Sequence, residues 1–220
     1  MLIANRNGMV VSKLDLQLFR GLVDGSITGD ITAEMLNGIT QIKSAGNRGI
    51  FAGTTITSIE IPTTCTAIGT YAFQNCGQLR SIVVPGTVSA IPDHMLCYCT
   101  SLTSVVLGEG ITGFGTLNSG GWVFEGCTSL HEVVFPDSIS NYSSYQCFQN
   151  SSVTHVTFGT GCTAINGKFF ENSRYVVDVT FRGMSMAAVQ GMADYPWQLN
   201  QHSGRTITFH CTDGDFTLTT

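Results

Sequence analysis

The sequence predicts a β-rich α/β solenoid in which each coil of 23 residues contributes one short parallel strand. The first observation is a column of apolar residues that recurs every 23 residues, with a single interval of 28. The column consists of Ile59, Ile82, Val105, Val133, Val156 and Val179. The second observation is that two further columns keep the same beat, one through Ile68, Ile91 and Ile165 and one through Phe73, Phe124 and Phe170. Matched columns of this kind indicate stacked units with a shared core.

The residues of one coil explain how a unit folds. Ile82, Val83 and Val84 alternate as a short strand whose first and third side chains point inward. Pro85 follows, where a missing N–H group is tolerated and the chain turns. A period of about 20–29 residues with one strand per unit is typical of a leucine-rich-repeat superhelix. We therefore expect strands that pair in parallel, in chain order, within one sheet. Their predicted centres are Ile59, Ile82, Val105, Val133, Val156, Val179 and Ile207.

The pattern in these coils resembles the BspA-like leucine-rich repeats. The match is carried by Ile59-Glu-Ile61-Pro62-Thr-Thr-Cys65-Thr-Ala-Ile68-Gly69-Thr-Tyr-Ala72-Phe73-Gln-Asn-Cys76 and covers roughly residues 50–182. The resemblance implies a right-handed, gently curved solenoid that binds partners, commonly on bacterial or protist cell surfaces, and that has no catalytic residues. The segment Ala187–Trp197 is also similar to the closing segment of short members found in phage and prophage virions.

Both ends of the chain are predicted to be caps. Residues 1–50 form an N-terminal cap and a first irregular coil, residues 51–182 the repeats, and residues 183–220 a C-terminal cap, all in one continuous domain. Leu14–Val23 after Ser12 predicts a short amphipathic helix. Met184–Ala193 predicts a second helix, with Trp197 covering the last coil and Ile207–Cys211 as a final strand. Solenoids need such terminal caps for solubility.

Composition excludes several classes of function. The net charge of −5, with only 11% charged residues, argues against nucleic-acid binding. No signal peptide and no long apolar segment is visible, so we expect no membrane insertion and folding in the cytoplasm before assembly. No cofactor or metal-binding motif stands out, since the cysteines lack zinc-site spacings. Cys76, Cys99 and Cys127 share one column, and we expect them to be buried and reduced, although a disulfide is conceivable by distance.

One polar row on the strands raises the question of catalysis. Glu132, His155 and Asp178 should point outward about 5 Å apart, an arrangement that could orient an imidazole or weakly hold a divalent metal. No nucleophile or enclosed pocket accompanies the row, and a solvated polar ladder explains it as well. The other histidines, His94, His202 and His210, share no ligand spacing. We therefore expect no enzymatic activity.

Two features point to binding. Val83, Val106 and Val134 form an apolar stripe at a strand position that the repeat leaves exposed, although β propensity alone would also favour valine there. The insertion Gly115–Gly121, with Leu117 and Asn118, should bulge from its coil and either bind or be a neutral loop. We place the binding residues in this stripe and loop, together with Glu132, His155 and Asp178.

These observations predict a non-enzymatic binding or structural protein displayed on a surface, with a protein or glycan as its partner. Assembly into a larger complex on a phage or prophage virion, for example on the tail, is the favoured setting, and a bacterial cell-surface adhesin is the alternative. A metal-binding protein or enzyme built on Glu132, His155 and Asp178 is a distant third reading.

Overall fold

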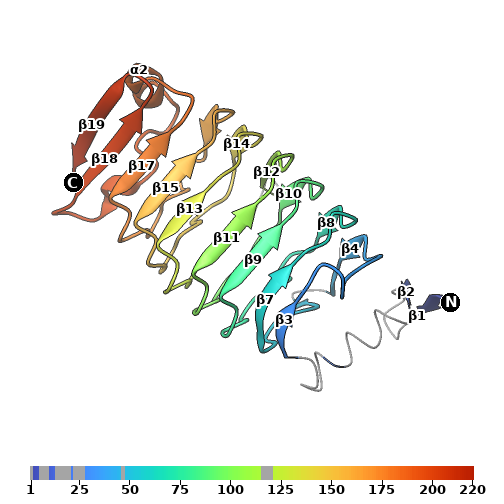
Figure 1. Ribbon diagram of the computed structural model, residues 1–220. Coiled ribbons are helices and arrows are strands. Elements are labelled where there is room, and N and C mark those ends of the chain that lie inside the picture. Colours follow the sequence, from blue (N-terminus) through green and yellow to red (C-terminus); the bar gives the residue numbers. More distant parts are fainter. Residues whose placement is uncertain (1, 5–9, 13–20, 22–27, 46–47, 115–120) are drawn as a thin grey trace.

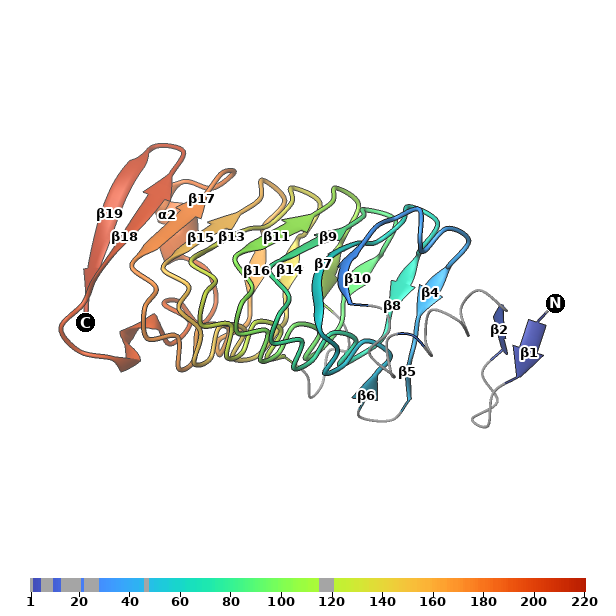
Figure 2. The same ribbon diagram turned by 60° about the horizontal axis from the view of Figure 1, so that its bottom comes forward.

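The computed structural model describes residues 2–4, 10–12, 21, 28–45, 48–114 and 121–220. Coils stack side by side into one elongated solenoid (Figure 1). Longer strands lie along one face and shorter strands along a second (Figure 2). This arrangement confirms the predicted parallel-strand solenoid.

The predicted strand is present in every coil. The first four strands are β3 (Gly29–Ile31), β7 (Ile56–Glu60), β9 (Ser81–Val84) and β11 (Ser104–Leu107), which pair in parallel in that order. The later strands are β13 (Glu132–Val134), β15 (His155–Phe158), β17 (Asp178–Phe181) and β18 (Thr206–Cys211), also parallel. An unpredicted strand, β19 (Gly214–Thr219), pairs with β18 in antiparallel fashion.

The prediction of a single sheet is wrong at one place. β11 and β13 lie next to each other (Figure 1), yet they belong to separate sheets. This β11–β13 break falls at the one 28-residue interval of the first column, so the coil with extra residues is the one that loses its ladder. Val105 and Leu107 are only half-buried there, whereas Ile82 and Val84 in the coil before are fully buried.

The predicted register of the last parallel strand is also wrong. Val179 pairs with Phe209, not with Ile207. The cap segment before β18 does not follow the repeat, so the 28-residue spacing did not carry over. A shift of two residues keeps every side chain on its expected face, because side chains alternate along a strand. Ile207 and Phe209 are accordingly both buried.

The second face carries two-residue strands. They are β4 (Gln41–Ile42), β8 (Ala67–Ile68), β10 (Ala90–Ile91), β12 (Gly113–Phe114), β14 (Asn141–Tyr142) and β16 (Ala164–Ile165). β4 pairs with β8, and β10 to β16 form a separate parallel row. Two small antiparallel pairs complete the list: β1 (Leu2–Ala4) with β2 (Val10–Ser12), and β5 (Ser44–Ala45) with β6 (Arg48–Gly49).

Aromatic rings form a continuous spine in the second half of the core. Phe158 stacks between Phe135 and Phe181, with ring centroids 5.8 Å and 4.9 Å away. Trp197 continues the column, 5.9 Å from Phe181, and is fully buried. The cap therefore places a ring where another coil would place its own, which confirms that Trp197 covers the last coil.

The cysteine column is buried, as predicted, and its cysteines are free thiols. Each thiol donates to a carbonyl of the preceding coil: Cys76 to Phe51 at 3.0 Å, Cys99 to Phe73 at 3.1 Å and Cys127 to Leu96 at 3.2 Å. Burial raises the pKa of the Cys127 thiol to about 12, so it stays protonated. A small residue with a weak donor satisfies a buried carbonyl in every coil.

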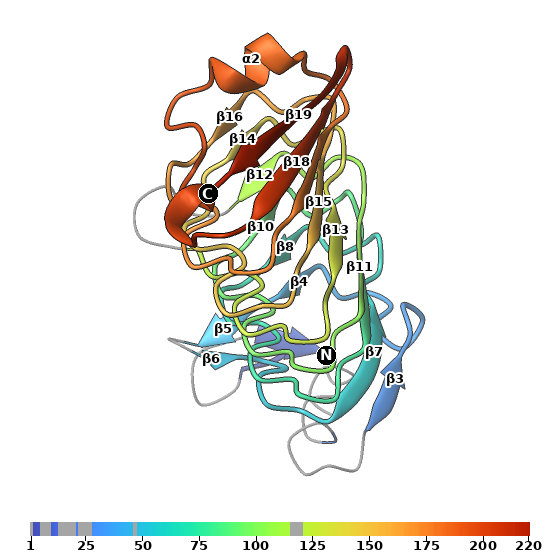
Figure 3. The same ribbon diagram turned by 90° about the vertical axis from the view of Figure 1, so that its left-hand side faces the viewer.

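The C-terminal cap is held by one arginine. α2 (Met186–Gln190) is shorter than the predicted helix; the Ser185 side chain caps it and Gly191 ends it (Figure 3). A 3-10 turn, η1 (Leu199–Gln201), follows. The Arg205 guanidinium donates to the carbonyls of Ser173, Val176 and Leu199 at 3.1, 3.1 and 2.8 Å, joining the cap to the last coil. The predicted helix Leu14–Val23 lies almost entirely outside the described residues.

Candidate binding surface

Three valines form an exposed row on the long strands. The side chains of Val83, Val106 and Val134 are 37%, 51% and 42% exposed, which confirms that they point outward. Val83 pairs directly with Val106 across β9 and β11. We call these three residues the valine ridge. The same column carries Glu60 before the valine ridge and Thr157 after it.

The β11–β13 break runs through the valine ridge. Val106 lies on one unpaired strand edge and Val134 on the other. Beneath them, Val105 and Leu107 pack against the core but remain half-buried. The ridge and the residues under it thus expose more apolar area here than elsewhere on this face, and such patches mark contact sites.

The polar row lies beside the valine ridge in the predicted register. Glu132 pairs with His155, and His155 with Asp178. The imidazole Nδ1 of His155 lies 2.8 Å from Thr154 Oγ1, while the Asp178 carboxylate bonds elsewhere. The three side chains therefore share a surface without forming a hydrogen-bonded triad. Across the described parts of the chain, no group of three His, Cys, Asp or Glu side chains is placed to hold a metal ion.

The sequence analysis missed the partner of Asp178. His210 lies between two carboxylates, with Nε2 3.0 Å from Asp178 Oδ2 and Nδ1 2.9 Å from Asp215 Oδ1. The hydrogen bond to Asp178, reinforced by that to Asp215, raises the pKa of His210. The shifted register of β18 brings His210 to this position. An Asp-Gly pair at 213–214, a common hairpin signal, could have revealed β19 and thus Asp215.

The loop candidates cannot be placed. Leu117 and Asn118 lie outside the described residues, so their role stays a prediction. The flanking Gly121 forms a parallel bridge with Tyr145.

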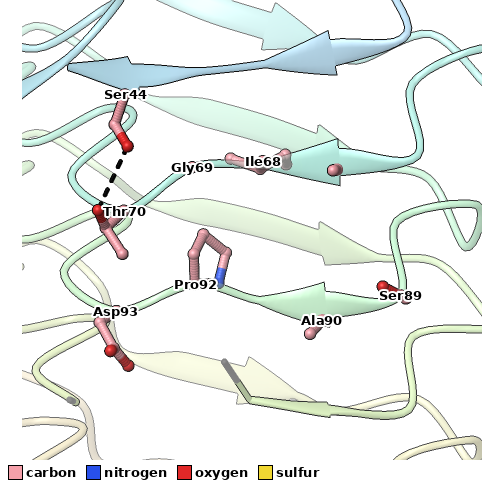
Figure 4. Close-up of a pocket in the computed structure, with 9 residues that line it drawn as sticks. Ser44, Ile68, Gly69, Thr70, Ser89, Ala90, Pro92 and Asp93 are labelled. Atoms are coloured by element: carbon pink, nitrogen blue, oxygen red, sulfur yellow. Dashed lines mark hydrogen bonds between the residues drawn. The ribbon is translucent and has the colours of Figure 1, made fainter. Parts of the chain in front are cut away.

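A shallow groove of about 310 Å³ lies on the second face, between β8 and β10 (Figure 4). Its cause is Pro92. The equivalent residue Gly69 donates its N–H to Ile42 at 2.7 Å, whereas Pro92 has no N–H to give to the coil before it. The Ser44 and Thr70 hydroxyls meet at one side, 3.3 Å apart, and the Pro92 ring lies between the strands. No sequence prediction fell on this groove.

Comparison with known proteins decides the family. The model for the BspA type leucine-rich repeat region matches residues 40–177 in six copies. The chain belongs to this family. BspA-type and other leucine-rich-repeat folds are generally binding scaffolds without catalytic activity. No helix in the described parts of this chain has the length and apolar character to cross a membrane.

Solved structures agree on the fold. The leucine-rich repeat protein TpLRR from T. pallidum is similar with a TM-score of 0.54 and 23% identity over 67% of this chain and 70% of that one. Leucine-rich repeat proteins from Bacteroides ovatus (TM-score 0.47) and Faecalibacterium prausnitzii (TM-score 0.45, a cell surface protein) also match. Both are 23% identical; the match covers 66% and 70% of this chain but only 38% and 47% of theirs. A search of curated proteins found no match.

Proposed function

We propose that this BspA-type protein is a non-enzymatic binding module displayed on a surface, and that its valine ridge contacts a protein or glycan partner. One observation carries the proposal. Apolar side chains recur in three consecutive coils at a position that the fold leaves exposed, and they stand above the β11–β13 break.

The geometry suits recognition by several weak contacts. Each coil offers one valine, and the strands hold the three in a row with little freedom to lose on binding. Glu132 and His155, both exposed, border the ridge and could orient a partner by charge. An apolar centre with a polar rim is the usual anatomy of a contact surface.

Display in many copies would make such contacts effective. Multivalency raises avidity without any new contact. A virion, for example the tail of a phage or prophage particle, is the setting we favour, with a bacterial cell surface as the alternative. Both settings use the same ridge.

The test compares charge substitutions inside and outside the valine ridge. Val106→Glu and Val134→Glu would be screened with wild type against immobilised bacterial cell-wall glycan, a glycan array and extracellular-matrix proteins. Wild type should bind at least one probe, and each variant should bind about tenfold more weakly, the loss of one apolar contact of about 1.4 kcal/mol. Both variants should stay folded, because an exposed strand side chain is replaced by a solvated one.

Thr180→Glu is the matched control. It adds the same charge in the same column, beyond the end of the valine ridge, and should leave binding unchanged. The proposal fails if wild type binds none of the probes, or if the ridge variants bind as well as Thr180→Glu does. Unfolding by Val106→Glu would show instead that this residue belongs to the core.

A further inference from the structure

The open edge of β19 is the one long strand edge at the C-terminal end of the solenoid. β19 is the last strand of its five-stranded sheet and lies outermost in two views (Figures 1 and 2). Unpaired edges are templates for another strand, and proteins usually protect them with lysine, proline or a bulge. β19 has none of these. Its one charged residue, Asp215, is already paired with His210.

The hydrogen-bonding pattern shows which residues face the open edge. The Thr220 N–H donates to the Arg205 carbonyl, so the pair 205–220 is hydrogen-bonded. Hydrogen-bonded pairs alternate along an antiparallel ladder, and Phe216 and Leu218 therefore bond inward to β18. The backbone groups of Asp215, Thr217 and Thr219 point to the open edge, and the side chains of all three are exposed.

We propose that β19 pairs with β19 of a second copy of this chain, antiparallel, about a two-fold axis through Thr217. In this register Thr217 faces its own counterpart and Asp215 faces Thr219. These are the residues whose N–H and C=O groups are free, and each such pair exchanges two bonds, giving about six in all. The two five-stranded sheets would then become one continuous sheet.

The side chains in this register are complementary as well. Phe216 would lie opposite Leu218 of the second copy; both side chains are half-buried in the single chain and pack on its core from one side. Their pairing would cover that remaining apolar surface. The two Asp215 carboxylates would stand four residues, or about 13 Å, apart along the strands, so no like charges meet.

The contact is small, and this sets the expected strength. Six-residue edge strands bury less than the roughly 1,200 Å² of a stable interface, so the dimer should form reversibly with rising concentration. The inference does not depend on what the valine ridge binds. Joining two solenoids end to end would nevertheless place two ridges on one sheet.

Sedimentation equilibrium of the full chain tests the dimer. Wild type should pass from the 23.6 kDa chain mass toward twice that mass as concentration rises. Thr217→Lys places two like charges on the axis and should remain monomeric. Thr63→Lys, at an exposed turn remote from β19, should behave as wild type. A monomeric wild type at every concentration, or a Thr217→Lys that still dimerises, overturns the proposal.

Cysteine variants test the register. Thr217→Cys should form an intermolecular disulfide on mild oxidation, because directly paired residues have Cα atoms about 5.5 Å apart. Thr219→Cys should not cross-link to itself, since its counterpart would lie about 13 Å away. Wild type controls for Cys211, the one native cysteine that is not buried. Equal cross-linking of the two variants, or none in Thr217→Cys, would show that the strands do not pair as proposed.

Discussion

Phe158 is the ring on which the aromatic spine depends, and replacing it with alanine should be severe. The side chain is fully buried and stacks with Phe181 at 4.9 Å and Phe135 at 5.8 Å. Tyr142 meets its ring edge-on at 4.7 Å. Phe158→Ala removes a buried ring, which costs about 3–5 kcal/mol, and each lost aromatic pair adds about 0.5–1.5 kcal/mol. We expect a loss of about 5 kcal/mol in the free energy of unfolding.

Guanidinium chloride unfolding followed by circular dichroism measures the loss. Phe158→Leu keeps most of the apolar volume and should lose clearly less, which keeps the comparison quantitative if the alanine variant does not fold. Val134→Ala truncates an exposed side chain and should stay within about 0.5 kcal/mol of wild type. A loss below about 1 kcal/mol for Phe158→Ala would refute the continuous core, because it would mean that adjacent coils do not share this ring.

Two further predictions concern titrating groups. After denaturation without reductant, a thiol assay should count eight cysteines, while the folded protein should expose at most Cys211; a count below eight would contradict the reduced column. His210 has a raised pKa, so its contribution to stability should be complete below about pH 6.5 and disappear as the pH rises through the folded-state value. Because the side chain is partly exposed, the effect should be at most about 1 kcal/mol. It should vanish in His210→Gln; equal pH dependence of the melting temperature in both proteins would exclude this role.

The repeat made most of the fold predictable, because each column position has one environment in every coil. Val106 could be placed outside, and Cys127 inside, from their column alone. The same logic located the row of Glu132, His155 and Asp178 before any coordinates. It could not say which neighbours those side chains choose: Asp178 turns to His210, which a column count had placed two residues away.

The prediction failed where the chain leaves the repeat. The interval of 28 residues was visible, but its consequence, a lost ladder between β11 and β13, depends on how the extra residues pack. Pro92 was visible too, yet a missing N–H becomes a groove only when the neighbouring coil has a carbonyl waiting for it. Local chemistry at such positions was readable, and its effect on pairing was not.

These departures also explain where recognition is expected. Regular coils present similar residues in similar places, so a solenoid of identical coils would offer a partner a uniform surface. Here the valine ridge crosses the β11–β13 break, the groove follows Pro92, and the open edge of β19 belongs to the cap. Each arises at a position where the 23-residue pattern is interrupted or ended. If Val106→Glu weakens binding while Thr180→Glu does not, the difference between two equally exposed faces of the strand sheet will trace to one interrupted coil, since the backbone that carries the two residues is otherwise the same.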